Sequence, residues 1–399
     1  MTICTETSSR ITNLECSVCG APHSAFKLQR VSVCHGMPLI ARYDLLDPLP
    51  KTSINLVEAS MWRYRELLPL LEDENRVSLG EGFTPIIALR NLANRYNLRS
   101  LVLKDEGKNP TGSFKARGLS MAISKAQELG VTGCIVPTAG NAGVAMAAYC
   151  AKAGMRAVVA MPRHTPKAFK EECYWYGAEV QLIDGLINDC AAWVRETNAD
   201  GHLLDVSTLK EPYRIEGKKT MGYEIAEQLG WHLPDVLLYP AGGGTGLIGI
   251  WKAFREMQAL GWLPADMKLP RMVAVQAENC QPLVETYLGR QANSQQYVGR
   301  PTIANGLAVP RPLGEPLMLS VLHESQGTAV SISEDEMLEG MRELGKQEGL
   351  FVAPEGAAVW MAARKLLASG WISADEQILL LNTGSGQKYL ENVEGRYDQ

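Results

Sequence analysis

Apolar and polar positions along this chain follow two periods, one typical of strands and the other of helices. Short β-rich runs are expected at 98–104, 133–137, 156–162 and 178–183, and amphipathic helical windows follow them at 116–130, 143–154, 166–176 and 189–199. Further buried strands are expected at 236–240, 272–276 and 378–382. Glycines stand where helices should end, at Gly130, Gly154, Gly177 and Gly230. This alternation predicts an α/β protein with parallel sheets covered by helices on both faces.

Composition narrows the class of partner. The chain has 399 residues, of which 46% are hydrophobic and 21% charged, and this is enough for two or three packed domains. Its net charge is −5 without a long basic run, which argues against nucleic acid or an anionic membrane as a partner. No stretch approaches the roughly 18 apolar residues of a membrane span, and residues 1–20 lack the features of a secretory signal. We therefore expect a cytoplasmic protein that binds a small molecule.

The N-terminal segment, residues 1–48, holds four of the nine cysteines. Cys16, Cys19 and Cys34 are spaced as in a zinc ribbon whose second cysteine pair is incomplete. Because an adjacent Cys-His pair rarely points both side chains at one metal, the favoured interpretation is a degenerate ribbon that packs without metal. Bound zinc is the alternative, and it would need a fourth ligand from His35, His23 or Cys4.

A lysine follows a turn-rich loop at the start of a predicted helix. The loop EGKNPTGS leads from a strand into a helical window, so that Lys115 lies in the first helical turn. A helix N-terminus and partial burial both disfavour the charged amine, and the neutral amine is the form that attacks an aldehyde. A solvated first-turn lysine is the plain alternative. Lys115 is therefore a candidate for a Schiff base with an aldehyde cofactor.

Three other turns carry groups that suit such a cofactor. The turn at 138–143 and the glycine-rich turn at 242–246 each join a buried strand to a helix, where free backbone N–H groups bind anions. A carboxylate would fit the first turn and a phosphate the second. Thr383 and Ser385 follow the last predicted strand, where either hydroxyl could meet a ring nitrogen. An aldehyde, a phosphate and a ring nitrogen together indicate pyridoxal phosphate.

Several motifs also resemble those of the threonine synthase family. Its members are fold type II, tryptophan synthase β-like enzymes that use pyridoxal phosphate. The motifs are KDEGKNPTGSFKARG, WRYRELLP, SLGEGFTP, PYRIEGKKT and TGSG, and the similarity covers nearly the whole chain. It implies that O-phosphohomoserine and water are converted to threonine and phosphate, with Lys115 as the Schiff-base lysine and proton shuttle. The implied cofactor contacts are Asn141 at the 3′-oxygen, Gly242, Gly243, Gly244, Thr245 and Gly246 at the phosphate, and Thr383 at the pyridine nitrogen. The implied substrate contacts are Thr138, Ala139, Gly140, Asn141, Ala142 and Arg214.

The similarity also implies an architecture. Two doubly wound α/β lobes would enclose the cofactor, a large one from 49–119 and 226–399 and a small mobile one from 120–225. Residues 1–48 would form the zinc-ribbon-like segment, and the protein would be a homodimer.

The chain departs from the family pattern at the site expected to hold the substrate phosphate. Thr208 and Leu209 stand where the family often has Asn-Ser, although Arg214 remains as a phosphate ligand. Two alternatives therefore stay open beside the favoured synthase. One is a pyridoxal phosphate-dependent serine or threonine ammonia-lyase or β-replacement enzyme, and the other is a non-catalytic binding protein.

Overall fold

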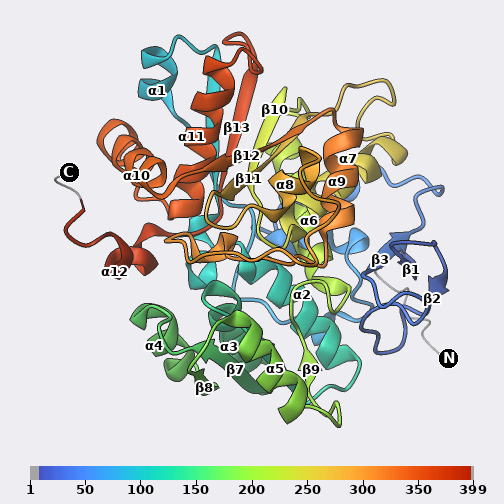
Figure 1. Ribbon diagram of the computed structural model, residues 1–399. Helices are drawn as coiled ribbons and strands as arrows, with labels where there is room; N and C mark the ends of the chain where they lie inside the picture. Colours follow the sequence, from blue (N-terminus) through green and yellow to red (C-terminus); the bar gives the residue numbers. More distant parts are fainter. Residues whose placement is uncertain (1–8, 397–399) are drawn as a thin grey trace.

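The structure, a computed structural model that describes residues 9–396, consists of three sheets and the helices that cover them (Figure 1). The largest sheet has the strand order β12-β11-β10-β13-β5-β4. Its strands run in parallel, except that β4 is antiparallel to β5. They are β4 (Ile86–Ala88), β5 (Ser100–Asp105), β10 (Val236–Pro240), β11 (Arg271–Ala277), β12 (Thr328–Ile332) and β13 (Gln377–Asn382).

Alternate side chains of this sheet enter two different cores. Leu237 and Leu379 point to one face, while Leu238 and Leu380 point to the other. Because both faces are covered, the strands read as continuous apolar runs. The first face is covered by α6 (Tyr213–Gln228), α7 (Thr245–Ala259), α8 (Pro282–Tyr287) and α9 (Glu315–Glu324), and the second by α1 (Arg90–Arg95), α10 (Glu334–Glu348) and α11 (Pro354–Ala368).

The second sheet is fully parallel, with the order β8-β7-β6-β9. Its strands are β6 (Gly133–Pro137), β7 (Arg156–Pro162), β8 (Glu179–Ile183) and β9 (Leu204–Asp205). One face packs on α2 (Lys115–Glu128), α3 (Asn141–Ala153) and α4 (Lys167–Trp175), and the other on α5 (Ile187–Thr197). The chain ends with α12 (Leu390–Val393).

The sequence predictions for these two sheets are confirmed. Every strand and helix expected from the alternating pattern is present, and the four glycines expected to end helices all have positive φ. The α/β prediction therefore holds. The boundaries proposed for the two lobes stay a prediction.

The third sheet belongs to the N-terminal segment, which we call the ribbon (residues 9–48). It has the order β2-β1-β3, formed by β1 (Ile11–Cys16), β2 (Pro22–His23) and β3 (Leu39–Tyr43). Leu14 and Leu39 of the ribbon pack into one core with Trp62 and with Tyr213 of α6. The ribbon is thus attached to the main body by shared apolar contacts.

A buried charge network strengthens this attachment. The Tyr43 hydroxyl donates a hydrogen bond of 2.8 Å to Glu216 of α6, and the ammonium of Lys219 lies 3.6 Å above the Tyr43 ring. Lys252 of α7 pairs with Glu216 at 2.8 Å and with Glu256 at 2.7 Å, and Lys219 pairs with the same two glutamates. Burial and the negative charge of Glu216 raise the pKa of Tyr43 well above its ordinary value, which keeps the phenol protonated.

Within residues 9–396, no helix has both the length and the apolar run that crossing a bilayer would need.

Candidate active site

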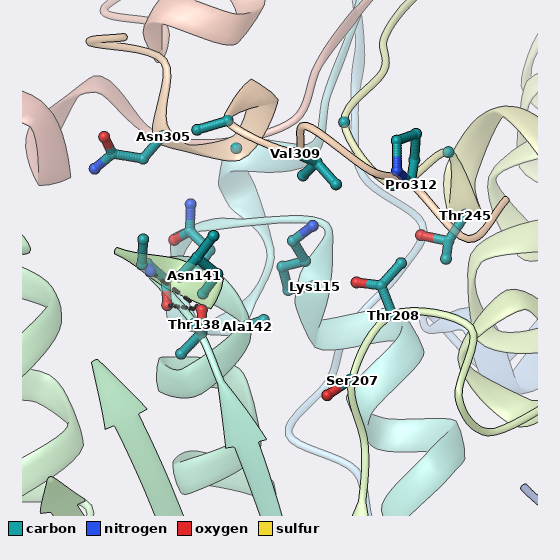
Figure 2. Close-up of a pocket in the computed structure, with 18 of the residues that line it drawn as sticks. Lys115, Thr138, Asn141, Ala142, Ser207, Thr208, Thr245, Asn305, Val309 and Pro312 are labelled. Carbon is teal, nitrogen blue, oxygen red and sulfur yellow. Dashed lines mark hydrogen bonds between the residues drawn. The ribbon is translucent and has the colours of Figure 1, made fainter. Parts of the chain in front are cut away.

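A cavity of about 440 Å³ opens between the six-stranded sheet and the four-stranded sheet, at the carboxyl ends of β6, β10 and β13. The helix starts of α2, α3 and α7 contribute to its wall, and the segment 305–313 lies opposite them. Figure 2 shows Lys115 near the centre, with Asn141 on one side, Thr208 on the other and Val309 across the opening. Parallel sheets place ligands at this edge, because strand ends and helix starts meet there.

Lys115 is positioned by a loop that is fixed to the end of β13. The backbone N–H of Phe114 donates to the carbonyl of Thr383 at 3.1 Å, and Ser113 forms a β-bridge with Gly384. Two successive left-handed residues, Thr111 at φ 60° and Gly112 at φ 63°, turn the chain just before this point. The first residue of α2 is therefore held against the last strand of the large sheet.

The surroundings of Lys115 favour its neutral form. Burial is the largest cause, and the positive charge of Arg214 acts in the same direction, while the negative charge of Glu355 opposes them. Together they lower the pKa of Lys115 from 10.5 to about 7. Its Nζ lies 4.4 Å from the centre of the Phe114 ring. An amine with this pKa is a nucleophile at neutral pH, as Schiff-base chemistry requires.

The glycine-rich turn between β10 and α7 forms a cradle without side chains. Gly244 has φ 81°, a left-handed conformation that glycine adopts without strain. A Cβ added at Gly242 would meet the carbonyl of Gly306, and one at Gly243 would meet the Thr208 methyl at 2.5 Å. The cradle precedes α7, whose first N–H groups lack intrahelical partners, so it suits a phosphate.

A chain of polar groups crosses the opposite wall of the cavity. The amide of Asn141, the first residue of α3, donates to the Tyr389 hydroxyl at 3.4 Å, and this hydroxyl donates to Glu355 at 2.9 Å. Glu355 also accepts a hydrogen bond of 2.7 Å from the backbone N–H of Gly306. Burial raises the pKa of Glu355. Asn141 Oδ1 and Glu355 Oε2 are buried without hydrogen-bond partners among residues 9–396, so each is free for a ligand.

Two cations of α6 lie at or just behind the cavity wall without a carboxylate within ion-pair distance among the described residues. Arg214 lines the cavity; its Nη1 donates to the carbonyl of Val206 at 2.5 Å, but its Nε and Nη2 are buried without partners. Lys218 is fully buried, with its amine 3.4 Å from the hydroxyl of Thr245. Burial, followed by the charges of Arg214 and Lys115, lowers the pKa of Lys218 well below its ordinary value. Buried and incompletely bonded basic groups of this kind are suited to bind an anion, whose negative charge would favour their protonated form.

The structure brings nearly all the site residues predicted from the sequence to this one cavity. The predicted residues that line it are Lys115, Thr138, Ala139, Gly140, Asn141, Ala142, Arg214, Gly242, Gly243, Gly244, Thr245 and Thr383. Gly246 lies behind the wall, where a side chain would collide with the Tyr239 ring. Ser385, the alternative to Thr383, instead accepts a hydrogen bond from the Gln387 N–H at the start of a short 3-10 helix. Cys16, Cys19 and Cys34 lie together in the ribbon and do not line the cavity.

Sequence reasoning missed three parts of the site. Glu355 reads as a charge at a helix start, and only the fold brings it to the cavity. The segment 305–313 lies in a stretch rich in glycine and proline that reads as a surface excursion. Lys218 stands out in the sequence only as a neighbour of Arg214, although its spacing of one helical turn from Arg214 places both on one face of α6.

Comparison with known proteins identifies the family to which this chain belongs. A profile of the family described as pyridoxal-phosphate dependent enzyme matches residues 77–384. The threonine synthase of Methanocaldococcus jannaschii is 32% identical over 376 residues, which are 94% of this chain and 92% of that protein. This chain belongs to the threonine synthase family. Another member, the threonine synthase of Methanosarcina acetivorans, is 34% identical over 375 residues, covering 93% of this chain and 91% of that protein.

Solved structures outside the family share its fold. The diaminopropionate ammonia lyase of Escherichia coli matches with a TM-score of 0.68 at 19% identity, over 88% of this chain and 95% of that one. The processed form of threonine deaminase isoform 2 from Solanum lycopersicum matches with a TM-score of 0.63 at 20% identity, over 76% of this chain and 79% of that one. The chain therefore has the fold type II architecture, and its cofactor is pyridoxal phosphate. The reactive lysine, the cradle without side chains and the unpartnered Asn141 oxygen all fit that cofactor.

Proposed function

We propose that the protein is a threonine synthase that converts O-phosphohomoserine and water to threonine and inorganic phosphate. When bound, pyridoxal phosphate supplies an electron-withdrawing ring that stabilises negative charge at the substrate's Cα. The observation that carries the proposal is Arg214, a buried arginine that lines the cavity and has two nitrogens without hydrogen-bond partners among the described residues. We assign it to the substrate phosphate, since the glycine cradle suits the phosphate of the cofactor.

The anion sites of the cavity match the anionic groups of cofactor and substrate. The cradle at 242–245 suits the cofactor phosphate, with Lys218 behind it at Thr245. The start of α3, residues 138–142, offers backbone N–H groups for the substrate carboxylate. Arg214, with two unpartnered nitrogens, is left for the phosphate that leaves the substrate. An ammonia-lyase, or a β-replacement enzyme whose substrate carries no phosphate, would leave this last site without a ligand.

Lys115 is the proposed proton carrier of the reaction. With a pKa of about 7, its Nζ is able to accept a proton from carbon and to return it at the same pH. Burial lowers the pKa of this amine most, the charge of Arg214 lowers it further, and the charge of Glu355 opposes both. Thr383 lines the cavity beside the Lys115 loop, and its hydroxyl is the proposed partner of the ring nitrogen. Segment 305–313 lines the cavity across from Asn141 and Lys115, where it would limit the access of bulk water.

The experiment that tests this function compares three substrates on the purified enzyme. O-phosphohomoserine, L-threonine and L-serine are each supplied, and free phosphate, threonine and 2-oxo acids are measured. The proposal expects phosphate and threonine in equal amounts from O-phosphohomoserine, with little 2-oxo acid from the other two. Formation of 2-oxobutyrate from threonine, without phosphate release from O-phosphohomoserine, would establish the ammonia-lyase instead.

A variant of Arg214 tests the phosphate site directly. Arg214→Met should lower kcat/KM for O-phosphohomoserine by about 100-fold, since charged hydrogen bonds to a phosphate are lost. It should also abolish competitive inhibition by inorganic phosphate. The matched control is Arg163→Met, because Arg163 is exposed and pairs with Asp184 away from the cavity. Equal kinetics in the two variants would remove the assignment of Arg214.

We further propose the assembly that family membership suggests. The enzyme would be a cytoplasmic homodimer, with residues 120–225 as a small lobe that closes on residues 49–119 and 226–399. The net charge of −5 is consistent with small anionic substrates bound at a few local cationic sites, without a nucleic acid or membrane partner.

A further inference from the structure

Two loops at the end of the ribbon have the same backbone conformation. In the first, Gly20 donates its N–H to the carbonyl of Cys16 at 2.9 Å, and in the second Gly36 donates to the carbonyl of Ser32 at 2.8 Å. Both glycines are left-handed, with φ of 70° and 63°. In each loop the first residue also donates its own N–H to the carbonyl five positions later, at 3.0 Å and 2.8 Å. The two loops therefore have the same type of turn.

Matching the loops position by position explains the incomplete cysteine pattern. Ser32 takes the place of Cys16 at the first position, and His35 takes the place of Cys19 at the fourth. Cys34, at the third position, has no counterpart among the ligand types of the first loop. The second loop has thus exchanged a cysteine at its first position for one at its third. The adjacent residues Cys34 and His35 nevertheless bring their ligand atoms within 4.8 Å of each other and of those of Cys16 and Cys19.

The side chains of Cys16, Cys19, Cys34 and His35, here called the ribbon cluster, have metal-site spacing. Their ligand atoms all lie within 4.8 Å of one another. The sulfurs of Cys19 and Cys34 are 3.6 Å apart, and the sulfur of Cys16 is 3.6 Å from His35 Nδ1. A tetrahedral zinc, with bonds of about 2.3 Å to sulfur and about 2.0–2.1 Å to nitrogen, sets two sulfurs about 3.8 Å apart and a sulfur and nitrogen about 3.6 Å apart. The observed separations agree with that geometry.

We propose that the ribbon cluster binds one structural zinc ion through three thiolates and one imidazole. The ion would join two loops that otherwise share few buried side chains, because Cys19, Cys34 and His35 are all exposed. It lies outside the catalytic cavity, so its role is to hold the end of the ribbon.

Neighbouring groups support this ligand set. The hydroxyl of Ser32 is buried, accepts the N–H of Met37 at 3.1 Å and lies 3.3 Å from the sulfur of Cys16, where it would donate to a ligating thiolate. Of the other ligands suggested by the sequence, His23 is engaged elsewhere: its ring bonds the carbonyl of Ala21 at 3.0 Å and the N–H of Val33 at 3.4 Å. Cys4 lies outside the described residues.

The test measures metal on the full-length holoenzyme, purified under reducing conditions without chelators. Elemental analysis should find about one zinc per chain that survives desalting. Replacement by cobalt(II) should give the thiolate charge-transfer bands and visible d–d absorption of a tetrahedral site. The Cys19→Ser/Cys34→Ser double variant should lose both signals, and Ser32→Ala should weaken zinc binding by about tenfold. Cofactor absorbance monitors whether each variant is still folded.

Matched variants separate this site from chance binding. His23→Asn and Cys190→Ser change the same residue types outside the cluster and should retain full zinc. If the double variant precipitates, His35→Ala serves in its place and should lower zinc affinity at least tenfold. The proposal is overturned if the reduced holoenzyme takes up neither zinc nor cobalt, or if the cluster variants retain as much metal as the controls. A Cys19–Cys34 disulfide without metal, found by mass spectrometry, would also overturn it.

Discussion

The proton affinity of Lys115 is the property on which the catalytic proposal depends most. A pKa lowered from 10.5 to about 7 leaves about half of these amines neutral at pH 7, against about one in three thousand for an ordinary lysine. Below its pKa the amine is protonated and unreactive, and above it the amine is free. Reactivity toward an acylating reagent should therefore rise tenfold per pH unit up to about pH 7 and then level off.

The assay is competitive labelling of the cofactor-free protein with a trace amount of acetic anhydride across a pH series. Mass spectrometry follows the Lys115 peptide, and exposed lysines such as Lys152 provide the reference profile in the same sample. Two variants should move the midpoint in opposite directions. Arg214→Met removes a positive neighbour and raises the pKa of Lys115, while Glu355→Gln removes a negative neighbour and lowers it. A wild-type midpoint above pH 9, or shifts of the same sign in both variants, would refute the explanation by burial and neighbouring charge.

Two further predictions concern the frame around this amine. Gly244→Ala should weaken pyridoxal phosphate binding and destabilise the fold by about 1–2 kcal/mol, because φ is 81° and a Cβ would collide with Met318. Gly261→Ala is the matched control: its φ is 69° with no atom within 4 Å, so titration of the cofactor should show unchanged affinity. Arg117→Met should cost about 3–5 kcal/mol in urea unfolding, because it leaves the buried carboxylates of Glu106 and Glu224 without their shared partner; a loss below 1 kcal/mol would contradict this.

The local sequence was sufficient to predict those parts of the site that lie within a single turn. The Lys115 loop and the cradle at 242–245 are each contiguous, and the strand-turn-helix pattern determines where their backbone groups point. The carboxyl ends of parallel strands meet at one edge of a sheet, so the fold class itself predicted that these turns would converge. Most of the cavity wall followed from these two facts.

The parts that escaped prediction depend on contacts between distant residues. Glu355 becomes a site residue only because it bonds Gly306, 49 positions away, and Tyr389, 34 positions away. Nothing in the surrounding letters of either partner indicates these contacts. The same limit left the choice among His35, His23 and Cys4 as a fourth ligand open, since the orientation of His35 depends on the repeated turn of the ribbon. The repeated turn is visible in the backbone hydrogen bonds. It is hidden in the sequence, because the second loop has Ser32 at the position where the first loop has a cysteine.

The Tyr43 hydroxyl bears on how far this chain could be shortened. A polypeptide that began after position 48 would lack β3 and its Tyr43. The buried charge network of Lys219, Lys252, Glu216 and Glu256 would then be exposed to solvent. Water would reach the flanks of α6 and α7, the helices that bear Arg214 and the phosphate cradle. Removing β1, β2 and β3 would therefore destabilise the helices that carry the active site, even though no residue of those strands lines the cavity.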